Sequence, residues 1–421
     1  MNDWPRQLSD FDRLPGVIKA DYSDFVVEEI PLYPADGAGT HTYFLVEKAG
    51  LSTMQAVHDL AKALNRRRHE IGFAGLKDAR AITRQWMSIE HVPPETIQRL
   101  SIPRLRILAV TRHHNKLRLG HLRANAFVIK VRQTRPQRLE DLRAALAELE
   151  RRGVPNYFGT QRFGYRGDTW RVGRSILHGL TDEAVDLLLG RPETEDRHDI
   201  RRARQLYDQG QYAAAARLWP RLFHSERRML KVLERTAGNR RKALAAIDRS
   251  TLNFYISAYQ SHLFNQVVSA RLPSGLGRLY DGDLAWVHAS GAVFRVTAAS
   301  VEQPRADAFE ISPTGPLLGY RMSTPTETAG ELEQRALGEE QPPAGAFHRS
   351  GLRVKGGRRR LRFPVSQAAV ALGADHAGPY LEMRFVLPRG CYATALLREL
   401  FRIDAADKGS ESEDAEVPPD E

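Results

Sequence analysis

The chain has 421 residues, of which 42% are hydrophobic, so it is long enough for two or three domains with cores of their own. This composition excludes a small disulfide-stapled protein and a wholly disordered chain. The single cysteine, Cys391, excludes an internal disulfide and a cysteine-based zinc site. No stretch approaches the roughly 18 uninterrupted apolar residues of a membrane helix, and the N-terminus lacks the apolar core of a secretory signal. We therefore expect a cytoplasmic protein without a membrane segment.

The charge of the chain indicates a polyanionic partner. The formal net charge is +11, but the segment 407–421 carries seven acids and one lysine, so residues 1–406 carry +17. Of the 62 basic residues, 52 are arginine, whose guanidinium group suits bidentate phosphate contacts and stacking on bases. Genome composition can also favour arginine over lysine, but it does not change the net charge. Nucleic acid is the partner that this balance favours.

The first 90 residues alternate in the way typical of strands, with one amphipathic stretch typical of a helix. The helix is predicted from Ser52 to about Arg66, because Ser52 and Gln55 form a capping-box pattern before apolar residues that share one face. A charged turn, 75–80, separates two short apolar runs. Strands are expected at 18–29, 39–47, 71–74 and 81–89.

A helix predicted at 139–152 presents three leucines on one face and ends at Gly153, with Pro155 beyond it, so we place the first domain boundary there. The chain then becomes more helical, and strand-like sequence returns near its end. The overall pattern predicts a mixed α+β domain whose two halves are separated by a more helical insertion. The remaining expectations are a strand at 127–132, helices within 201–249 and 252–272, turns and strands at 275–296, a linker at 324–346, strands from 351 and at 380–388, and a disordered acidic tail after 402.

Asp78 is the first residue that could carry chemistry. It lies in the turn between two predicted strands, beside Lys77 and two residues before Arg80. Nearby cations keep a carboxylate ionised, and a tight turn holds it rigidly, so it could act as a nucleophile or a base. An aspartate in a hairpin turn is also common without any catalytic role.

Three further stretches could contact RNA. A basic stretch from Arg112 to Arg118 leads to Asn125, and a basic stretch followed by a polar amide and an aromatic suits a phosphate backbone with a stacked base. The segment 156–164 combines aromatic residues, glycines, amides and an arginine, which fits either a ligand contact or a packed hinge. The cluster 355–360 fits either a phosphate clamp on a flexible turn or a solvated charge run. His113 and His114 lack a third ligand at useful spacing, so no metal site is expected.

The two glutamates that follow the first apolar run cannot both serve the same site. Glu28 and Glu29 are neighbours in a strand and therefore point to opposite faces. Either one, but not both, can join Lys19 and Asp78 in a cleft. The sequence contains no phosphate-binding loop, dinucleotide fingerprint or metalloprotease motif, so no cofactor is expected.

Taken together, these segments resemble the TruD-type tRNA pseudouridine synthases, the tRNA pseudouridine(13) synthases. Seven segments between residues 18 and 400 occur in the order of that family. They are Ile18–Lys19 with Ser23–Glu28, Phe73–Asp78 with Thr83–Trp86, Lys116–Gly120, Asn125–Phe127, Val154–Gly159 with Gln161–Gly164, Ser257–Ser261 with Leu263–Asn265, and Leu387–Thr394 with Leu397–Leu400.

The resemblance implies a V-shaped, two-domain molecule of the α+β class. Its catalytic domain has a mixed, mainly antiparallel sheet, and an α/β TRUD insertion domain interrupts it. The two halves of the catalytic domain are expected at 1–154 and 348–405, the insertion at 155–347, and the acidic tail at 406–421. The protein is expected to bind tRNA as a monomer, without a metal or a cofactor.

The resemblance also implies roles for particular residues. Asp78 takes the place of the catalytic aspartate, while Phe25, Asn125 and Tyr392 line the uridine site. Tyr392 departs from the phenylalanine that members can carry there. Phe25, Phe127 and Tyr392 are expected to stack on a uracil swung out of the RNA. Supporting or RNA-binding roles are expected for Lys19, Glu28, Lys77, Arg80, Phe127, Asn156, Arg162, Arg358 and Arg360.

The implied reaction breaks the C1′–N1 bond of uridine, turns the uracil and rejoins it through C5. Asp78 either attacks C1′ or removes a proton from C2′, and the sequence does not choose between these roles. Two rival interpretations remain: a catalytically silent RNA-binding protein on the same scaffold, and a nucleoside or sugar hydrolase that pairs Asp78 with Glu28 or Glu29.

Overall fold

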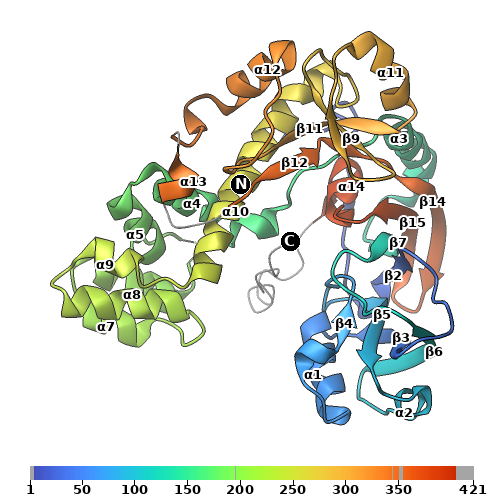
Figure 1. Ribbon diagram of the computed structural model, residues 1–421, viewed down its shortest axis with the longest axis horizontal. Coiled ribbons are helices and arrows are strands. Elements are labelled where there is room, and N and C mark those ends of the chain that lie inside the picture. The colour runs from blue at the N-terminus through green and yellow to red at the C-terminus, as the bar shows by residue number, and fades with distance from the viewer. Residues whose placement is uncertain (1–3, 195, 344, 350–353, 404–421) are drawn as a thin grey trace. The chain divides into compact units, whose positions relative to one another are not determined.

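The computed structural model describes residues 4–194, 196–343, 345–349 and 354–403, and Figure 1 shows its helices and strands. The described chain forms two compact units. We call residues 6–154 with 363–403 the split unit, and residues 155–362 with 4 and 5 the inserted unit. The chain passes between them at β8 (Val154–Pro155) and β13 (Arg362–Phe363). The tail predicted at 406–421 lies outside the described residues, as does the start of the strand predicted from 351.

The split unit contains a sheet of eight described strands in the order β14-β15-β7-β2-β5-β3-β6, with the short β4 paired to β5. Only the pairing of β2 with β5 is parallel, so the predicted α+β class with a mixed, mainly antiparallel sheet is confirmed. The strands are β2 (Phe25–Pro31), β3 (His41–Ala49), β4 (Gly72–Phe73), β5 (Ile82–Glu90), β6 (Leu105–His113), β7 (Leu122–Arg132), β14 (Ser366–Asp375) and β15 (Gly378–Pro388).

Two hydrophobic clusters stabilise this sheet. One lies between the strands β2, β7 and β15 and the helices α3 and α14, and the leucines predicted to face inward, Leu142, Leu146 and Leu149, are buried in it. The other covers the far end of the sheet with α1, whose N-cap Ser52 accepts a hydrogen bond from the Gln55 amide, as the capping pattern predicts. The remaining elements are α1 (Thr53–Ala63), α2 (Pro94–Gln98), α3 (Leu139–Arg152), α14 (Ala393–Leu400), the parallel pair β1 (Leu14–Gly16) and β16 (Phe401–Ile403), and the 3₁₀ turns η1 (Tyr22–Asp24), η2 (Arg68–Glu70) and η3 (Pro136–Arg138).

The inserted unit is organised along the long helix α10 (Arg249–Arg271), which carries buried side chains over most of its length. Figure 1 shows α5, α7, α8 and α9 around its N-terminal end, where the helical segment predicted within 201–249 is confirmed. These elements are η4 (Thr160–Phe163), α4 (Thr169–His178), α5 (Thr181–Leu189), α6 (His198–Asp208), α7 (Tyr212–Leu218), α8 (His224–Arg235), α9 (Arg240–Leu244) and η5 (Leu272–Ser274).

A second sheet of the inserted unit has the order β10-β9-β11-β12. It corrects two expectations. The predicted linker 324–346 contains the helix α12, which buries Ala329, Glu333 and Leu337, and the predicted flexible turn at 355–360 contains the strand β12, which pairs with β11. Residues 354–362 consequently pack in the inserted unit. The elements are β9 (Leu284–Val287), β10 (Val293–Arg295), α11 (Ala299–Asp307), β11 (Ile311–Leu317), α12 (Glu327–Leu337), η6 (Gly338–Glu340), α13 (Ala346–Arg349) and β12 (Gly357–Arg360).

Candidate functional site

Asp78 lies in the loop that joins β4 to β5 in the split unit. Its side chain is 56% exposed, and its Oδ2 accepts a hydrogen bond from Lys19 Nζ at 2.8 Å. The two strands are antiparallel, with Phe73 opposite Met87, so the turn expected from the sequence is present. The carboxylate is therefore open to solvent and carries one bound cation.

Lys19 holds an unusual backbone conformation. Its φ is +57°, a region that costs a non-glycine residue of the order of 1 kcal/mol or more. The side chain is 17% exposed, and its Nζ lies 4.6 Å from the centre of the Phe25 ring as well as beside Asp78. In this conformation the Lys19 ammonium group contacts both the Asp78 carboxylate and the Phe25 ring.

Lys48 also binds the loop of Asp78, from the buried side of the sheet. The sequence analysis did not identify this residue. It lies on β3 and is 1% exposed, and its Nζ donates to the backbone carbonyls of Leu51, Lys77 at 3.5 Å and Asp78 at 3.3 Å. A sequence signal existed, because Lys48 shares the buried phase of its strand with Phe44 and Val46. A lysine in an apolar phase is costly unless its charge is used.

The residue before Asp78 is anchored in the interior. Lys77 Nζ lies 2.7 Å from Glu29 Oε2, and the two side chains are 5% and 1% exposed. The Lys77 amide also donates to Thr53 Oγ1 at 2.9 Å. Glu29 is thus the glutamate on the side of the Asp78 loop. Glu28, which the sequence predicts among the supporting residues, points to the other face and pairs with Arg84 at 3.1 Å.

The three expected stacking rings differ in exposure. Phe25 and Phe127 are 3% and 8% exposed and meet edge to face, and Phe127 stacks on Phe385. Both rings are therefore packed in the core of the split unit, and their expected stacking on a uracil stays a prediction. Tyr392, at the N-cap of α14, is 47% exposed and is accessible to a ligand.

Asn125 offers an unused acceptor. It lies on β7 opposite Glu29 of β2 and Leu387 of β15, so its side chain is on the same face as the Lys77–Glu29 pair. Its Oδ1 is buried and has no hydrogen-bond partner within the described chain. A buried acceptor without a partner costs about 1–3 kcal/mol, and a ligand N–H group would relieve that cost.

Three loops of the split unit are joined at this edge of the sheet. The Gly120 amide donates to the Ala74 carbonyl at 2.8 Å, and Arg389 Nη1 donates to the Gly120 carbonyl at 2.8 Å. The β6–β7 loop consequently connects the loop of Asp78 to the loop of Tyr392. Each of the three loops exposes one large apolar side chain, and these are Leu76, Leu119 and Tyr392.

Two RNA-binding candidates of the inserted unit, Asn156 and Arg358, are bound to other residues of the same unit. Asn156 is 1% exposed, and its Nδ2 donates to the Arg360 carbonyl while its Oδ1 accepts from Arg359. Arg358 is buried against Glu333 at 2.7 Å, so it cannot serve as the phosphate clamp that the cluster suggested.

The other basic candidates are less confined. Arg162 donates to Ser257 Oγ and lies over the Phe254 ring, and Arg360 lies over Trp286. Arg80, next to the catalytic candidate, is half-buried, and its side chain makes no hydrogen bond or ion pair within the described residues. Of the basic candidates beside Asp78, Arg80 is therefore the one still available to a ligand.

The described residues contain no group of three or more His, Cys, Asp or Glu side chains arranged to hold a metal ion. Nor does any described helix combine the length and apolar character needed to cross a bilayer.

Comparison with solved structures shows that the chain has the fold of a tRNA pseudouridine synthase. The chain superimposes with a TM-score of 0.82 on the crystal structure of a Methanosarcina mazei protein named for tRNA pseudouridine synthase D (TruD). The two are 26% identical, and the match covers 95% of this chain and 96% of that one.

Comparison of sequences gives the family. The family model described as tRNA pseudouridine synthase D (TruD) matches residues 6–400. A tRNA pseudouridine synthase D of Geobacter metallireducens is 44% identical over 92% of this chain and 95% of its own length, and one of Geobacter sulfurreducens is 42% identical over 92% and 94%. The chain belongs to the TruD family of tRNA pseudouridine synthases, as its resemblance to that family predicts.

Proposed function

We propose that this protein converts a uridine of tRNA, at position 13, to pseudouridine, with Asp78 as the catalytic carboxylate. The C1′–N1 bond breaks, the uracil turns, and a C1′–C5 bond forms, while the proton on C5 is replaced by one on N1. The product has the same atoms as the substrate, so the reaction consumes no co-reactant. The relatives named above carry the name of this activity.

The observation that carries the proposal is the state of the Asp78 carboxylate. It is half exposed, one of its oxygens is bound to Lys19 at 2.8 Å, and its backbone is held by the buried Lys48. A carboxylate held in this way is positioned before the substrate arrives. Its remaining oxygen is available to the ribose of a uridine.

The base would be held by the groups around this carboxylate. The uracil must leave its stack to reach Asp78, and the exposed Tyr392 gives it a ring to lie on. The unpartnered Oδ1 of Asn125 suits the N3–H donor on the uracil edge. Phe25 would contact the Lys19 ammonium group through the face of its ring, and it would not stack on the base.

The test compares Asp78→Asn with the wild-type protein and with Asp10→Asn, a matched change at an exposed carboxylate that accepts a hydrogen bond from Ser9. We expect the wild type and Asp10→Asn to form pseudouridine at one position of a tRNA transcript, and Asp78→Asn to form none within the time that the wild type needs to complete the reaction, while binding the RNA as tightly. Pseudouridine formation by Asp78→Asn at a rate near that of the wild type would contradict the role of this residue. Mapping pseudouridines in tRNA from cells that lack the protein checks the position.

The rival interpretations predict other products. A silent RNA-binding protein leaves every uridine unchanged, and a hydrolase releases free uracil and lowers the mass of the RNA. Nuclease digestion followed by mass spectrometry separates the three outcomes. Deuterium at C2′ of the target uridine then distinguishes the two roles of Asp78, because only removal of the C2′ proton is slowed by a primary isotope effect.

A further inference from the structure

A hollow of about 500 Å³ lies in the split unit beside the loop between β6 and β7. Pockets that bind small ligands measure about 300–1,000 Å³, so this hollow has room for one nucleotide. The catalytic roles proposed above use none of its lining residues. These are Tyr33, His113, Asn115, Lys116, Arg118 and His121.

One wall of the hollow is a stack of aromatic rings. Tyr33 stacks on His113 with ring centres 5.1 Å apart, and His113 stacks on Tyr43 at 4.8 Å. Tyr43 is buried on β3, and its hydroxyl donates to the Asn115 carbonyl at 2.8 Å. The Asn115 amide in turn donates to His113 Nδ1 at 2.9 Å. Because the sheet anchors this stack, the wall is formed before any ligand binds.

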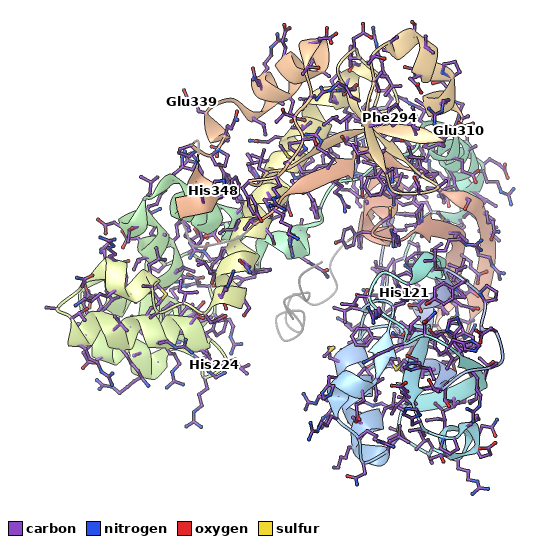
Figure 2. All side chains as sticks on the ribbon, in the orientation of Figure 1. His121, His224, Phe294, Glu310, Glu339 and His348 are labelled. Atoms are coloured by element: carbon purple, nitrogen blue, oxygen red, sulfur yellow. The ribbon has the colours of Figure 1, made fainter. Side chains whose placement is uncertain are left out.

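His121 presents a donor to the hollow. It is labelled on the split unit in Figure 2, and its Nδ1 lies 2.7 Å from the Tyr33 hydroxyl. Burial, and then the charges of Arg118 and Arg389, hold the pKa of His121 below its usual value. A lowered pKa favours the neutral ring near pH 7, and in the tautomer in which Nδ1 accepts from the Tyr33 hydroxyl, Nε2 carries the proton and is a donor.

Two cations face the same space. Arg118 is exposed, and its guanidinium makes no hydrogen bond or ion pair within the described residues, while Lys116 donates to the His69 carbonyl and keeps its other protons. Asp36 lies beside the aromatic wall, 2.6 Å from His114 Nδ1 and 4.0 Å from His113 Nε2, but it is not among the residues that line the hollow. The lining therefore has a net positive charge.

The hollow is coupled to the loop of Asp78. Its residues 115–121 form the loop whose Gly120 amide is bonded to the Ala74 carbonyl, four residues before Asp78. An RNA strand that presents a uridine to Asp78 therefore passes next to this loop.

We propose that this hollow holds one nucleotide adjacent to the target uridine, with its phosphate between Arg118, Lys116 and the Nε2–H of His121. Arginine, lysine and an imidazole N–H are the side-chain donors that suit phosphate oxygens. The aromatic wall bounds the sugar and base. The inference rests on the proposed function, because it takes RNA as the substrate.

The first test measures RNA binding without turnover. Fluorescence anisotropy with a tRNA transcript, over a range of salt concentrations, compares Arg118→Ala and Arg99→Ala in the Asp78→Asn protein. Arg99 is a matched control, since it too is exposed and makes no side-chain hydrogen bond or ion pair within the described chain. We expect Arg118→Ala to weaken binding about 3–10-fold and to reduce the slope of log K against log salt by about 1, whereas Arg99→Ala leaves the slope unchanged.

The second test identifies the phosphate. Ethylating single phosphates of the RNA should reveal one beside the target uridine whose modification weakens binding to the parent protein but not to Arg118→Ala, because both changes remove the same contact. Equal slopes for the two arginine variants, or ethylation effects that are identical in both, would overturn the proposal. Thermal unfolding of Arg118→Ala verifies that the variant is folded.

Failure of this inference is distinguishable from failure of the proposed function. If Arg118→Ala binds RNA as the parent protein does, while the wild type still forms pseudouridine, only the proposed nucleotide site in the hollow is rejected. An Arg118 effect in a wild-type protein that forms no pseudouridine rejects the activity and retains the RNA contact.

Discussion

Two aspartates of the split unit, Asp24 and Asp78, both bind a cation but in opposite ways. Asp24 is fully buried, and Arg132 donates to both of its oxygens, at 2.6 and 2.8 Å. The Asp21 amide donates to it as well. Asp78 is 56% exposed and accepts one hydrogen bond, from Lys19 at 2.8 Å.

This difference separates a structural carboxylate from one that is open to a ligand. The oxygens of Asp24 are occupied by fixed donors, so it stabilises the fold and has nothing left to offer a substrate. Asp78 keeps an oxygen open, while the loop beneath it is fixed by the buried Lys48 and by the Lys77–Glu29 pair. The neighbours of Asp78 hold its loop rigid, and its unused oxygen is the atom that the proposed function assigns to the ribose.

The largest expected effect on stability follows the loss of Arg132. Arg132→Met leaves Asp24 buried without its cation, so we expect the free energy of unfolding to fall by about 4 kcal/mol. Urea unfolding measures this change. Arg123→Met, at an exposed position of the same strand, serves as the control and should change stability by less than about 0.5 kcal/mol. Equal effects of the two variants would contradict the structural role of the Arg132–Asp24 pair.

A slightly smaller loss is expected when the loop of Asp78 loses its anchor. Lys77→Met leaves Glu29 buried and unpaired, which should cost about 3 kcal/mol of stability. It should also slow turnover at saturating tRNA, because Asp78 is no longer held in place. Lys62→Met on the exposed side of α1 provides the comparison. Full turnover in folded Lys77→Met protein would show that the anchor does not position Asp78.

Lys19 should separate activity from stability. Lys19→Gly places glycine where φ is +57° and removes the ammonium group from Asp78. We expect the free energy of unfolding to change by less than about 1 kcal/mol, while the rate at saturating tRNA falls about 100-fold because the carboxylate loses its orientation. Single-turnover kinetics and urea unfolding of the same preparation check both parts, and an unchanged rate would remove Lys19 from the site.

The smallest expected effect concerns Asp375, which shares Arg132 with the structural carboxylate Asp24. Here we expect the stability of the protein to depend on pH. Hydrogen bonds from Arg132, and then Lys130, hold the pKa of Asp375 below its ordinary 3.8. A carboxylate with a lowered pKa in the folded state stabilises the protein above the unfolded value, and this contribution is lost as the pH falls toward the folded value. Below pH 4 we therefore expect the stability of the wild type to decline more steeply than that of Asp375→Asn. Parallel profiles would contradict this assignment.

Local patterns were sufficient for much of the split unit. The alternation in β7 and the leucine face of α3 depend on neighbours in the sequence, and both are present as predicted. The helix α12 was missed because its burial depends on a distant pairing, in which Glu333 accepts hydrogen bonds from Arg358 of β12. Because this pairing cannot be seen in the sequence, Arg358 was expected to be a free cation suited to binding phosphate, whereas in the structure it is bound to Glu333.

The sequence predicted some residues of the candidate site and left others undecided. Asp78, Lys19, Asn125 and Tyr392 follow from the family resemblance and lie on loops or strand ends of the split unit. The choice between Glu28 and Glu29 could not be made, because two-residue periodicity places them on opposite faces without saying which face carries the loop. Lys48 could have been found from the burial phase of its strand.

The most direct test measures pseudouridine formation in a single turnover at saturating tRNA for Asp78→Asn and Asp24→Asn, together with the stability of each variant. We predict that Asp78→Asn lowers the rate by at least about 1,000-fold and leaves stability within about 0.5 kcal/mol of the wild type. Asp24→Asn should lower stability by about 2 kcal/mol and keep the rate of the folded protein near that of the wild type. Turnover by Asp78→Asn at a rate close to that of Asp24→Asn would contradict the account.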